Sequence, residues 1–468
     1  MNNSKLILLL NTFSPQEIHR FRLYLQSPYH NANPLFYELY EAIRPYLHSR
    51  NKNEINALLV WKQINPTVKF NTIQFNKHCS NLYQLAANFI ALNSIETKSN
   101  TIPLQFLKVL NQRKLTALFP FHATKAKQEI EKVNQKTNQF FDNFLWQQEF
   151  NNYQEVLQSR TKPRNTAEVL TALDNFYLHQ KLKYWSVALH YQKMFDQPIS
   201  ILWDDFLFDY LQQNQQADET IEINRQILLL EKLDDATLHY KWLKEKLMNK
   251  KSKLLFTTQK EIYLFLINYC IAQINSGESK YYKEIFEIYK LGLRLDLIIQ
   301  QKIISPWDFK NIITVALQQK EINWAENFIV KYNSNLPKDE IENAYNYNLA
   351  KVFFIQKKYT ESLKLLNQVA YTDIFYQLDI KILQAKTLFE LNESDTLDDL
   401  MVSFTKLLNR KRKLSNHYQK RYKRFINYLQ KILKVESEAK INTLILQLEN
   451  DNEVPDRNWL LEKIKSKK

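Results

Sequence analysis

A run of basic residues near one end of this 468-residue chain is the feature whose residue types and spacing point most directly to chemistry. No acidic residue lies between Asp399 and Glu436, whereas eleven Lys and Arg residues do. Like charges at this density repel one another, and an anionic partner would relieve the repulsion. The sequence therefore predicts that an acidic surface or a nucleic-acid backbone is bound by Arg410, Lys411, Arg412, Lys413, Lys420, Lys423, Arg424, Lys431 and Lys434.

A helix over residues 416–435 would carry part of this run on one face. At about 100° of rotation per residue, Lys420, Arg424 and Lys431 point to one side of such a helix. The opposite side carries the apolar residues Tyr422, Phe425, Leu429, Ile432 and Leu433. We expect the apolar face to pack on the rest of the protein and the charged residues of 406–434 to form a basic ridge.

The basic ridge has two interpretations. In the first it binds nucleic acid or ribosomal RNA, although no RNP, KH or zinc-finger pattern accompanies the charge. In the second it is a solvated lysine-rich surface, paired with the middle of the chain. Residues 201–400 are mildly acidic, while both ends of the chain are basic.

Metal ligation and catalysis have little support in the sequence. None of the nine histidines lies four residues from another, and no H-E-x-x-H motif occurs. Cys79 falls on an apolar stripe, so we expect a buried apolar role for it. Adjacent carboxylates such as Asp204 and Asp205 are typical of helix starts. We predict no metal, no cofactor and no enzymatic activity; an enzyme with an unusual site is the third alternative.

Glycine is almost absent, since only Gly277 and Gly292 occur where average usage predicts about 33. Phosphate-binding loops need closely spaced glycines, and these two are fifteen residues apart. We expect Gly277 to end a helix and Gly292 to allow two helices to pack closely.

Apolar residues recur at intervals of three and four, which predicts an all-α protein. Ser14, Pro15 and Glu17 form a helix-start signal, and residues 124–157 read as one long helix or a helix pair. The polar stretch 159–166 reads as a linker between a helical region, 1–158, and an α-solenoid of antiparallel helix hairpins, 166–468. The aromatic rings that we expect mainly in the core, with a peptide groove as the alternative, are Trp185, Trp203, Trp242, Trp307 and Trp324.

Residues 346–366 resemble a tetratricopeptide repeat. Ala350 and Ser362 stand where that repeat needs small residues, and bulky positions are filled by Phe353, Tyr359 and Leu366. Neighbouring units are displaced by 37 and 35 residues, near the spacing of about 34 for this repeat. We expect repeat-like units around 310–335, 345–370 and 380–405.

Other stretches resemble an uncharacterised bacterial family of helical-repeat proteins. They are Phe13–Ser14, Glu17, Phe21, Leu25 and Ser27–Tyr29 near the start, and 305–311, 324–328 and 347–350 later in the chain. The resemblance implies a helical-repeat architecture and no activity.

The apolar run Leu6–Leu10 is shorter than the roughly 7–15 residues of a signal peptide, and no segment reaches the length of a membrane span. With only two cysteines, the sequence predicts a cytoplasmic protein. The predicted function is a non-catalytic scaffold or adaptor that binds another protein through its helical-repeat surface. The alternative is nucleic-acid or ribosome binding through the basic ridge.

Overall fold

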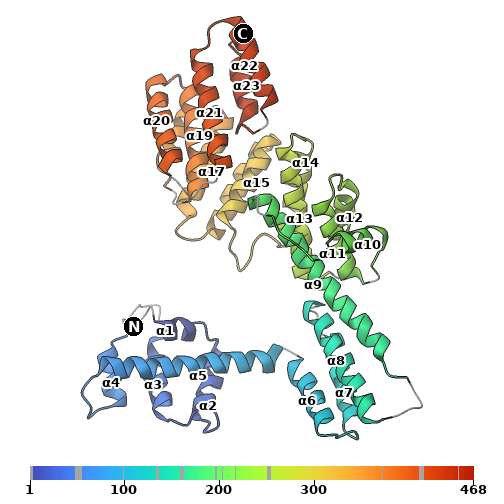
Figure 1. Ribbon diagram of the computed structural model, residues 1–468. Helices are drawn as coiled ribbons and strands as arrows, with labels where there is room; N and C mark the ends of the chain where they lie inside the picture. The colour runs from blue at the N-terminus through green and yellow to red at the C-terminus, as the bar shows by residue number, and fades with distance from the viewer. Residues whose placement is uncertain are drawn as a thin grey trace. The chain divides into compact units, whose positions relative to one another are not determined.

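The protein is all-helical in a computed structural model (Figure 1). The structure describes residues 4–47, 55–98, 100–132, 136–158, 163–195, 198–202, 204–216, 218–249, 254–370, 373–410, 416–451 and 453–467. These residues contain no β-strand, only an isolated bridge between Gln300 and Ile303. The predicted all-α class is therefore confirmed. No helix in the described ranges is both long enough and apolar enough to cross a membrane.

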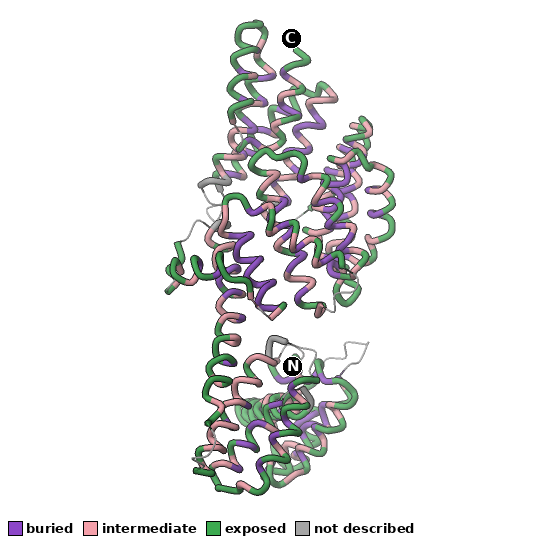
Figure 2. Tube along the Cα trace, turned by 90° about the vertical axis from the view of Figure 1, so that its right-hand side faces the viewer, coloured by how far each residue is buried: buried purple, intermediate pink, exposed green. Residues whose placement is uncertain are grey.

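The chain divides into two compact units, Met1–Leu178 and His179–Lys468, and the division falls inside helix α9 (Thr166–Phe195). The linker predicted at 159–166 precedes α9, and its residues 159–162 lie outside the described residues. Within each unit most helices bury one side and expose the other (Figure 2).

The first unit has one apolar core among helices α1–α5 and another among α6–α8. Its helices before α9 are α1 (Lys5–Leu10), α2 (Pro15–Gln26), α3 (Leu35–Ile43), the 3₁₀ helix η1 (Arg44–Tyr46), α4 (Ala57–Ile64), α5 (Thr72–Lys98), α6 (Thr101–Gln112), α7 (Phe119–Lys132) and α8 (Lys136–Val156). Residues 124–157 thus form parts of two helices, which settles the choice that the sequence left open.

The start of α2 shows how local sequence fixes an element of the first unit. The Ser14 hydroxyl accepts a hydrogen bond from the Glu17 amide at 3.3 Å, and the Glu17 carboxylate accepts one from the Ser14 amide at 2.8 Å. This reciprocal pair is the predicted capping box, and it satisfies two amides that have no partner inside the helix.

In the second unit most consecutive helices pack together, as α13 packs on α14 and α17 on α18. Some helices that are two apart in the sequence also pack, such as α15 and α17. The helices are α10 (Asp204–Gln213), α11 (Glu219–Lys232), α12 (Thr237–Met248), α13 (Phe256–Asn275), α14 (Tyr281–Arg294), α15 (Pro306–Gln318), α16 (Ile322–Tyr332), η2 (Asn333–Asn335), α17 (Ile341–Ile355), α18 (Tyr359–Leu366), α19 (Ile374–Glu390), α20 (Ser394–Arg410), α21 (Asn416–Lys434), α22 (Glu438–Asn450) and α23 (Arg457–Lys465). Each of the three expected repeat-like units therefore spans parts of two consecutive helices.

Small residues bring α17 and α18 into close contact. Ala350 on α17 and Ser362 on α18 are both completely buried. The Ser362 hydroxyl donates a hydrogen bond to the Ala350 carbonyl oxygen at 2.8 Å. A larger side chain at either position would separate the two helices, which is why the small residues predicted here are needed.

The two glycines have the roles that the sequence predicts. Gly277 follows the end of α13 with a backbone φ of 102°, a left-handed conformation that favours glycine. Gly292 lies inside α14, where a Cβ atom would stand 2.5 Å from Cε2 of Tyr263. The backbone of α14 can therefore approach α13 only because residue 292 has no side chain.

We expect Gly292→Ala to destabilise the protein by roughly 1–3 kcal/mol, because the Tyr263 ring and the helix backbone would have to separate. Chemical denaturation measures the change in the free energy of unfolding. The matched control is Lys283→Ala on the exposed side of the same helix, which should change it by less than about 0.5 kcal/mol. Equal effects of the two substitutions would contradict this account.

Candidate functional site

Three lysines from three different helices come together in the second unit. Lys310 lies on α15, Lys351 on α17 and Lys386 on α19, and two aspartates, Asp379 and Asp456, lie among them. We call these five residues the lysine cluster. It is the candidate functional site because it concentrates charge between helices, where charge has to be compensated.

The positions of these lysines follow from the spacing of the helices. Thr314, Lys351 and Lys386 are 37 and 35 residues apart, the same displacements that relate the repeat-like units. Since α15 packs on α17 and α17 packs on α19, residues at equivalent positions become neighbours in space. Lys310 stands one helical turn before Thr314 and joins the same group.

Two of the lysines are paired with carboxylates. The Lys310 ammonium lies 2.7 Å from Oδ2 of Asp379, and the Lys386 ammonium lies 2.7 Å from Oδ1 of Asp456. Tyr422 of α21 donates a hydrogen bond to the other oxygen of Asp379 at 3.3 Å. These contacts leave both aspartates engaged, so neither is available as a free general base.

Lys351 differs from its neighbours because it has no ion pair within the described ranges. Its ammonium donates a hydrogen bond to the Thr314 hydroxyl. Burial and, to a smaller extent, the nearby charge of Lys310 lower the pKa of Lys351 to about 7, against the opposing effect of Asp379 and Asp456. A substantial fraction of this amine is therefore neutral at physiological pH.

Aromatic rings surround the lysine cluster. The Lys310 ammonium lies 4.3 Å from the ring centre of Trp307 and 4.7 Å from that of Tyr376, distances typical of cation–π contacts. The Lys351 ammonium lies 5.4 Å from the ring centre of Tyr347. Trp307 is 38% exposed, so the expectation that it is a core residue is wrong. Trp307 lies in the first turn of α15, where its ring is partly exposed to solvent.

The other tryptophans are mostly packed in the core. Trp185 is buried, and Trp242 and Trp324 pack against the main core of the second unit. Trp203 lies outside the described residues.

The basic ridge is only partly described. Residues 411–413 and the side chain of Arg410 lie outside the described residues, so the structure gives no account of Arg410, Lys411, Arg412 and Lys413 there. On α21 the predicted apolar face is confirmed, since four of its members are buried, namely Tyr422, Phe425, Leu429 and Ile432.

The charged side of α21 is partly neutralised. Arg424 lies 2.8 Å from a carboxylate oxygen of Asp451 and 2.9 Å from one of Glu453, both in the connection between α22 and α23. Lys420, Lys431 and Lys434 are exposed, Lys423 is half-buried, and none of these four has an ion pair in the part of the chain that the structure describes. The ridge available to a partner is thus narrower than the sequence suggests.

Two open hollows lie on the surface of the second unit. One of about 380 Å³ lies between α14 and α16 and is lined by Arg294, Trp324 and Lys331 among others. The other, of about 430 Å³, is lined by Lys381 of α19 and Lys406 of α20. Lys406, the first residue of the predicted ridge, therefore faces a different region from the lysines of α21.

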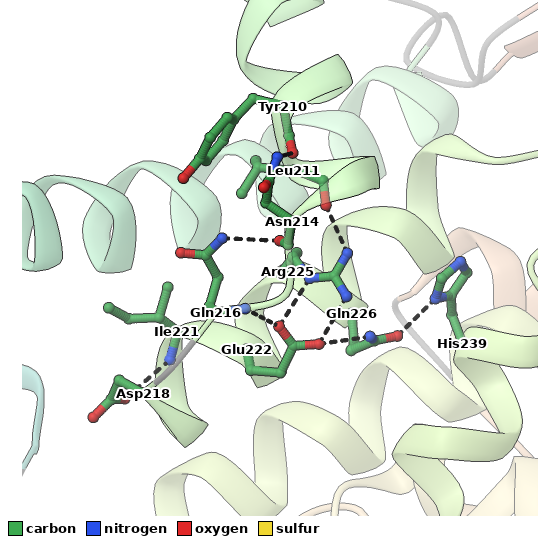
Figure 3. Close-up of polar contacts among 10 residues, drawn as sticks. All are labelled: Tyr210, Leu211, Asn214, Gln216, Asp218, Ile221, Glu222, Arg225, Gln226 and His239. Carbon is green, nitrogen blue, oxygen red and sulfur yellow. Dashed lines mark hydrogen bonds and ion pairs between the residues drawn. The ribbon is translucent and has the colours of Figure 1, made fainter.

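A second buried charged group belongs to the core and not to a site (Figure 3). Every residue of α11 from Thr220 to Glu231 is buried, including the ion pair Glu222–Arg225. Arg225 donates to both carboxylate oxygens of Glu222, at 2.8 and 2.9 Å, and to the Leu211 carbonyl oxygen at 2.6 Å. The charges of this ion pair are compensated inside the protein, and the hydrogen bond from Arg225 to Leu211 connects α11 to α10.

Hydrogen bonds hold the Glu222 carboxylate in its charged form. Burial by itself raises the pKa of Glu222, but hydrogen bonds from Arg225, Gln216 and Gln226 outweigh it, and the pKa lies below its usual value. Gln226 connects this hydrogen-bond network to His239, whose Nδ1 lies 2.6 Å from the Gln226 side-chain oxygen. Burial lowers the pKa of His239, so its imidazole stays neutral beside this network.

Metal ligands do not gather in the described residues, where no group of three or more His, Cys, Asp or Glu side chains is placed to hold an ion. Cys79 is half-buried rather than buried, and burial raises the pKa of its thiol to about 11. Such a thiol is poorly nucleophilic.

Sequence reasoning located the basic ridge and missed the lysine cluster. The cluster contains one lysine from each of three helices. Because these lysines are far apart in the sequence, no local run of basic residues indicates the cluster. The signal that could have found it is the recurrence of Lys351 and Lys386 at the repeat spacing.

Comparisons with protein-family models, with curated proteins and with solved structures gave no match for this chain. The resemblance to helical-repeat proteins stays a prediction.

We expect Glu222→Gln to destabilise the protein by about 3–5 kcal/mol, because Arg225 would be left as an uncompensated buried charge. Since the pKa of Glu222 is lowered on folding, the ion pair stabilises the protein at neutral pH, and this stabilisation is lost as the pH falls through the lowered value. Denaturant unfolding at several pH values measures both effects.

The control is Glu219→Gln on the same helix, which removes the more exposed ion pair with Lys246. That loss should be at most about 1 kcal/mol. If the two variants lost similar amounts of unfolding free energy at neutral pH, the buried ion pair would contribute no more stability than the exposed one.

Proposed function

We propose that this protein is a non-catalytic scaffold or adaptor, an α-solenoid of antiparallel helix hairpins whose last third is tetratricopeptide-like. In this proposal a segment of another protein lies along α15, α17 and α19 and contacts the lysine cluster and Trp307. The observation that carries the proposal is the convergence of these cationic and aromatic side chains from three helices.

General features of protein interfaces support this proposal. Energetically important interface residues are often Trp, Tyr or Arg and lie near the centre of the contact. The exposed Trp307, whose ring contacts the ammonium of Lys310, has this character. Arrays of helix pairs also offer extended surfaces to a bound segment.

The same arrangement favours binding over catalysis. Both aspartates of the cluster already accept short contacts from lysines, and Asp379 also accepts a hydrogen bond from Tyr422. An acid–base mechanism would first have to break these pairs. We therefore propose that the protein has no enzymatic activity.

A second candidate function is binding of nucleic acid or ribosomal RNA by the basic ridge. Four lysines of α21 that have no ion pair among the described residues favour it, namely Lys420, Lys423, Lys431 and Lys434. Counterion release would make such binding fall steeply with salt.

We expect Trp307→Ala to weaken binding of the captured protein partner by at least about 2 kcal/mol, because the ring would supply much of the desolvated contact area. The measurement is affinity capture from native lysate with nuclease, followed by quantitative binding of the purified partner. Phe206→Ala, at an exposed aromatic residue on α10, is the matched control and should bind like the wild type.

Three results together would favour the second candidate over this proposal. The partner would be lost on nuclease treatment, its binding would be unchanged in Trp307→Ala, and its binding would disappear when Lys420 and Lys431 are replaced by Glu.

A further inference from the structure

We infer that Lys351 is the binding point for an oxyanion, a carboxylate or a phosphate group carried by the protein segment that the proposed function places on this face. The inference rests on that proposed function and names the chemical group that the site selects.

The charge balance of the cluster points to an anion. Lys310 and Lys386 each have an aspartate at 2.7 Å, whereas Lys351 has none. The cluster thus holds three lysines and two carboxylates, and a bound oxyanion would complete the third pair. A charged lysine between helices without a carboxylate partner is costly, so this position favours a negative ligand over a neutral one.

The Lys351 ammonium has hydrogen-bond donors that no described residue uses. The ammonium of Lys351 has three N–H groups, and Thr314 accepts one of them. The Thr314 hydroxyl itself donates to the Lys310 carbonyl oxygen at 2.7 Å, which fixes it as an acceptor toward Lys351. Two donors of Lys351 are therefore left for a ligand.

Tyr347 adds a further donor on the same helix face. It stands one turn before Lys351, is only 3% exposed, and its ring centre lies 5.4 Å from the Lys351 ammonium. A tyrosine hydroxyl is a hydrogen-bond donor, and an oxyanion held by Lys351 would accept a hydrogen bond from it. Lys351 itself is half-buried, so part of its side chain reaches solvent.

Anion binding at this position should be coupled to protonation. The groups that face Lys351 are Lys310 from α15, Asp379 and Lys386 from α19 and Asp456 before α23, and the pKa of Lys351 among them is about 7. An oxyanion favours the charged amine, so binding takes up protons near neutral pH and weakens as the pH rises. Tyr347 also faces this space and stays neutral there, since burial raises its pKa well above the ordinary value.

The test uses the full chain and two small probes, sodium acetate for a carboxylate and sodium sulfate for a phosphate group, in calorimetric titrations at constant ionic strength. For the wild type we expect affinity for at least one probe to be about 20-fold weaker at pH 8.5 than at pH 6.5, as the protonated fraction of Lys351 falls. Binding of acetate alone assigns an Asp or Glu of the partner, and binding of sulfate alone assigns a phosphorylated residue.

Three variants separate this role from a structural one. Lys351→Met should abolish binding without lowering thermal stability, because it removes a desolvated amine. Lys351→Arg should still bind, without the dependence on pH, because arginine keeps its charge. Lys364→Met, at an exposed lysine of α18, should behave like the wild type.

Binding that survives in Lys351→Met, binding that does not change between pH 6.5 and 8.5, or no binding of either probe would overturn the inference. In each of these cases the proposed function stands if capture of the partner still depends on Trp307. If capture does not depend on Trp307 but Lys351 binds a probe, the inference about the anion survives and the proposed partner site fails.

Discussion

The desolvation of charged side chains between packed helices is the constraint on which the second unit depends. The charges of Glu222 and Arg225 are fully compensated, because these two side chains form hydrogen bonds with each other and Arg225 also donates to a buried backbone carbonyl. The charges of Lys310 and Lys386 are each compensated by an ion pair with one aspartate. Lys351 has a hydrogen bond to Thr314 but no carboxylate partner among the described residues, and its pKa is lowered. This difference separates a structural ion pair from a candidate binding point.

Close packing of helices creates this constraint in a chain with almost no glycine. Ala350 and Ser362 let α17 and α18 touch, and Gly292 lets α14 approach Tyr263 of α13. Helices that lie this close leave little room for water around the polar residues between them. The same packing that brings Lys351 next to Thr314 therefore also removes most of the solvent that would keep its amine charged.

The features that the sequence predicts correctly are local. The capping box at Ser14, the helix end at Gly277 and the apolar face of α21 each depend on residues within a few turns of one another. The features that it misses join distant residues: Lys310 and Asp379 are 69 positions apart, and Lys386 and Asp456 are 70 apart. Such pairs depend on how helices stack, and periodicity alone does not specify which side chains then meet.

The ionisation of Lys351 tests the central claim most directly. Competitive acylation of the native protein over a range of pH, with mass spectrometry of each labelled lysine, gives the pKa of this amine. The account predicts a midpoint of about 7 for Lys351, far below the ordinary value of 10.5, and an upward shift when an anion is bound. A midpoint near the ordinary value, unchanged by anions, would contradict it.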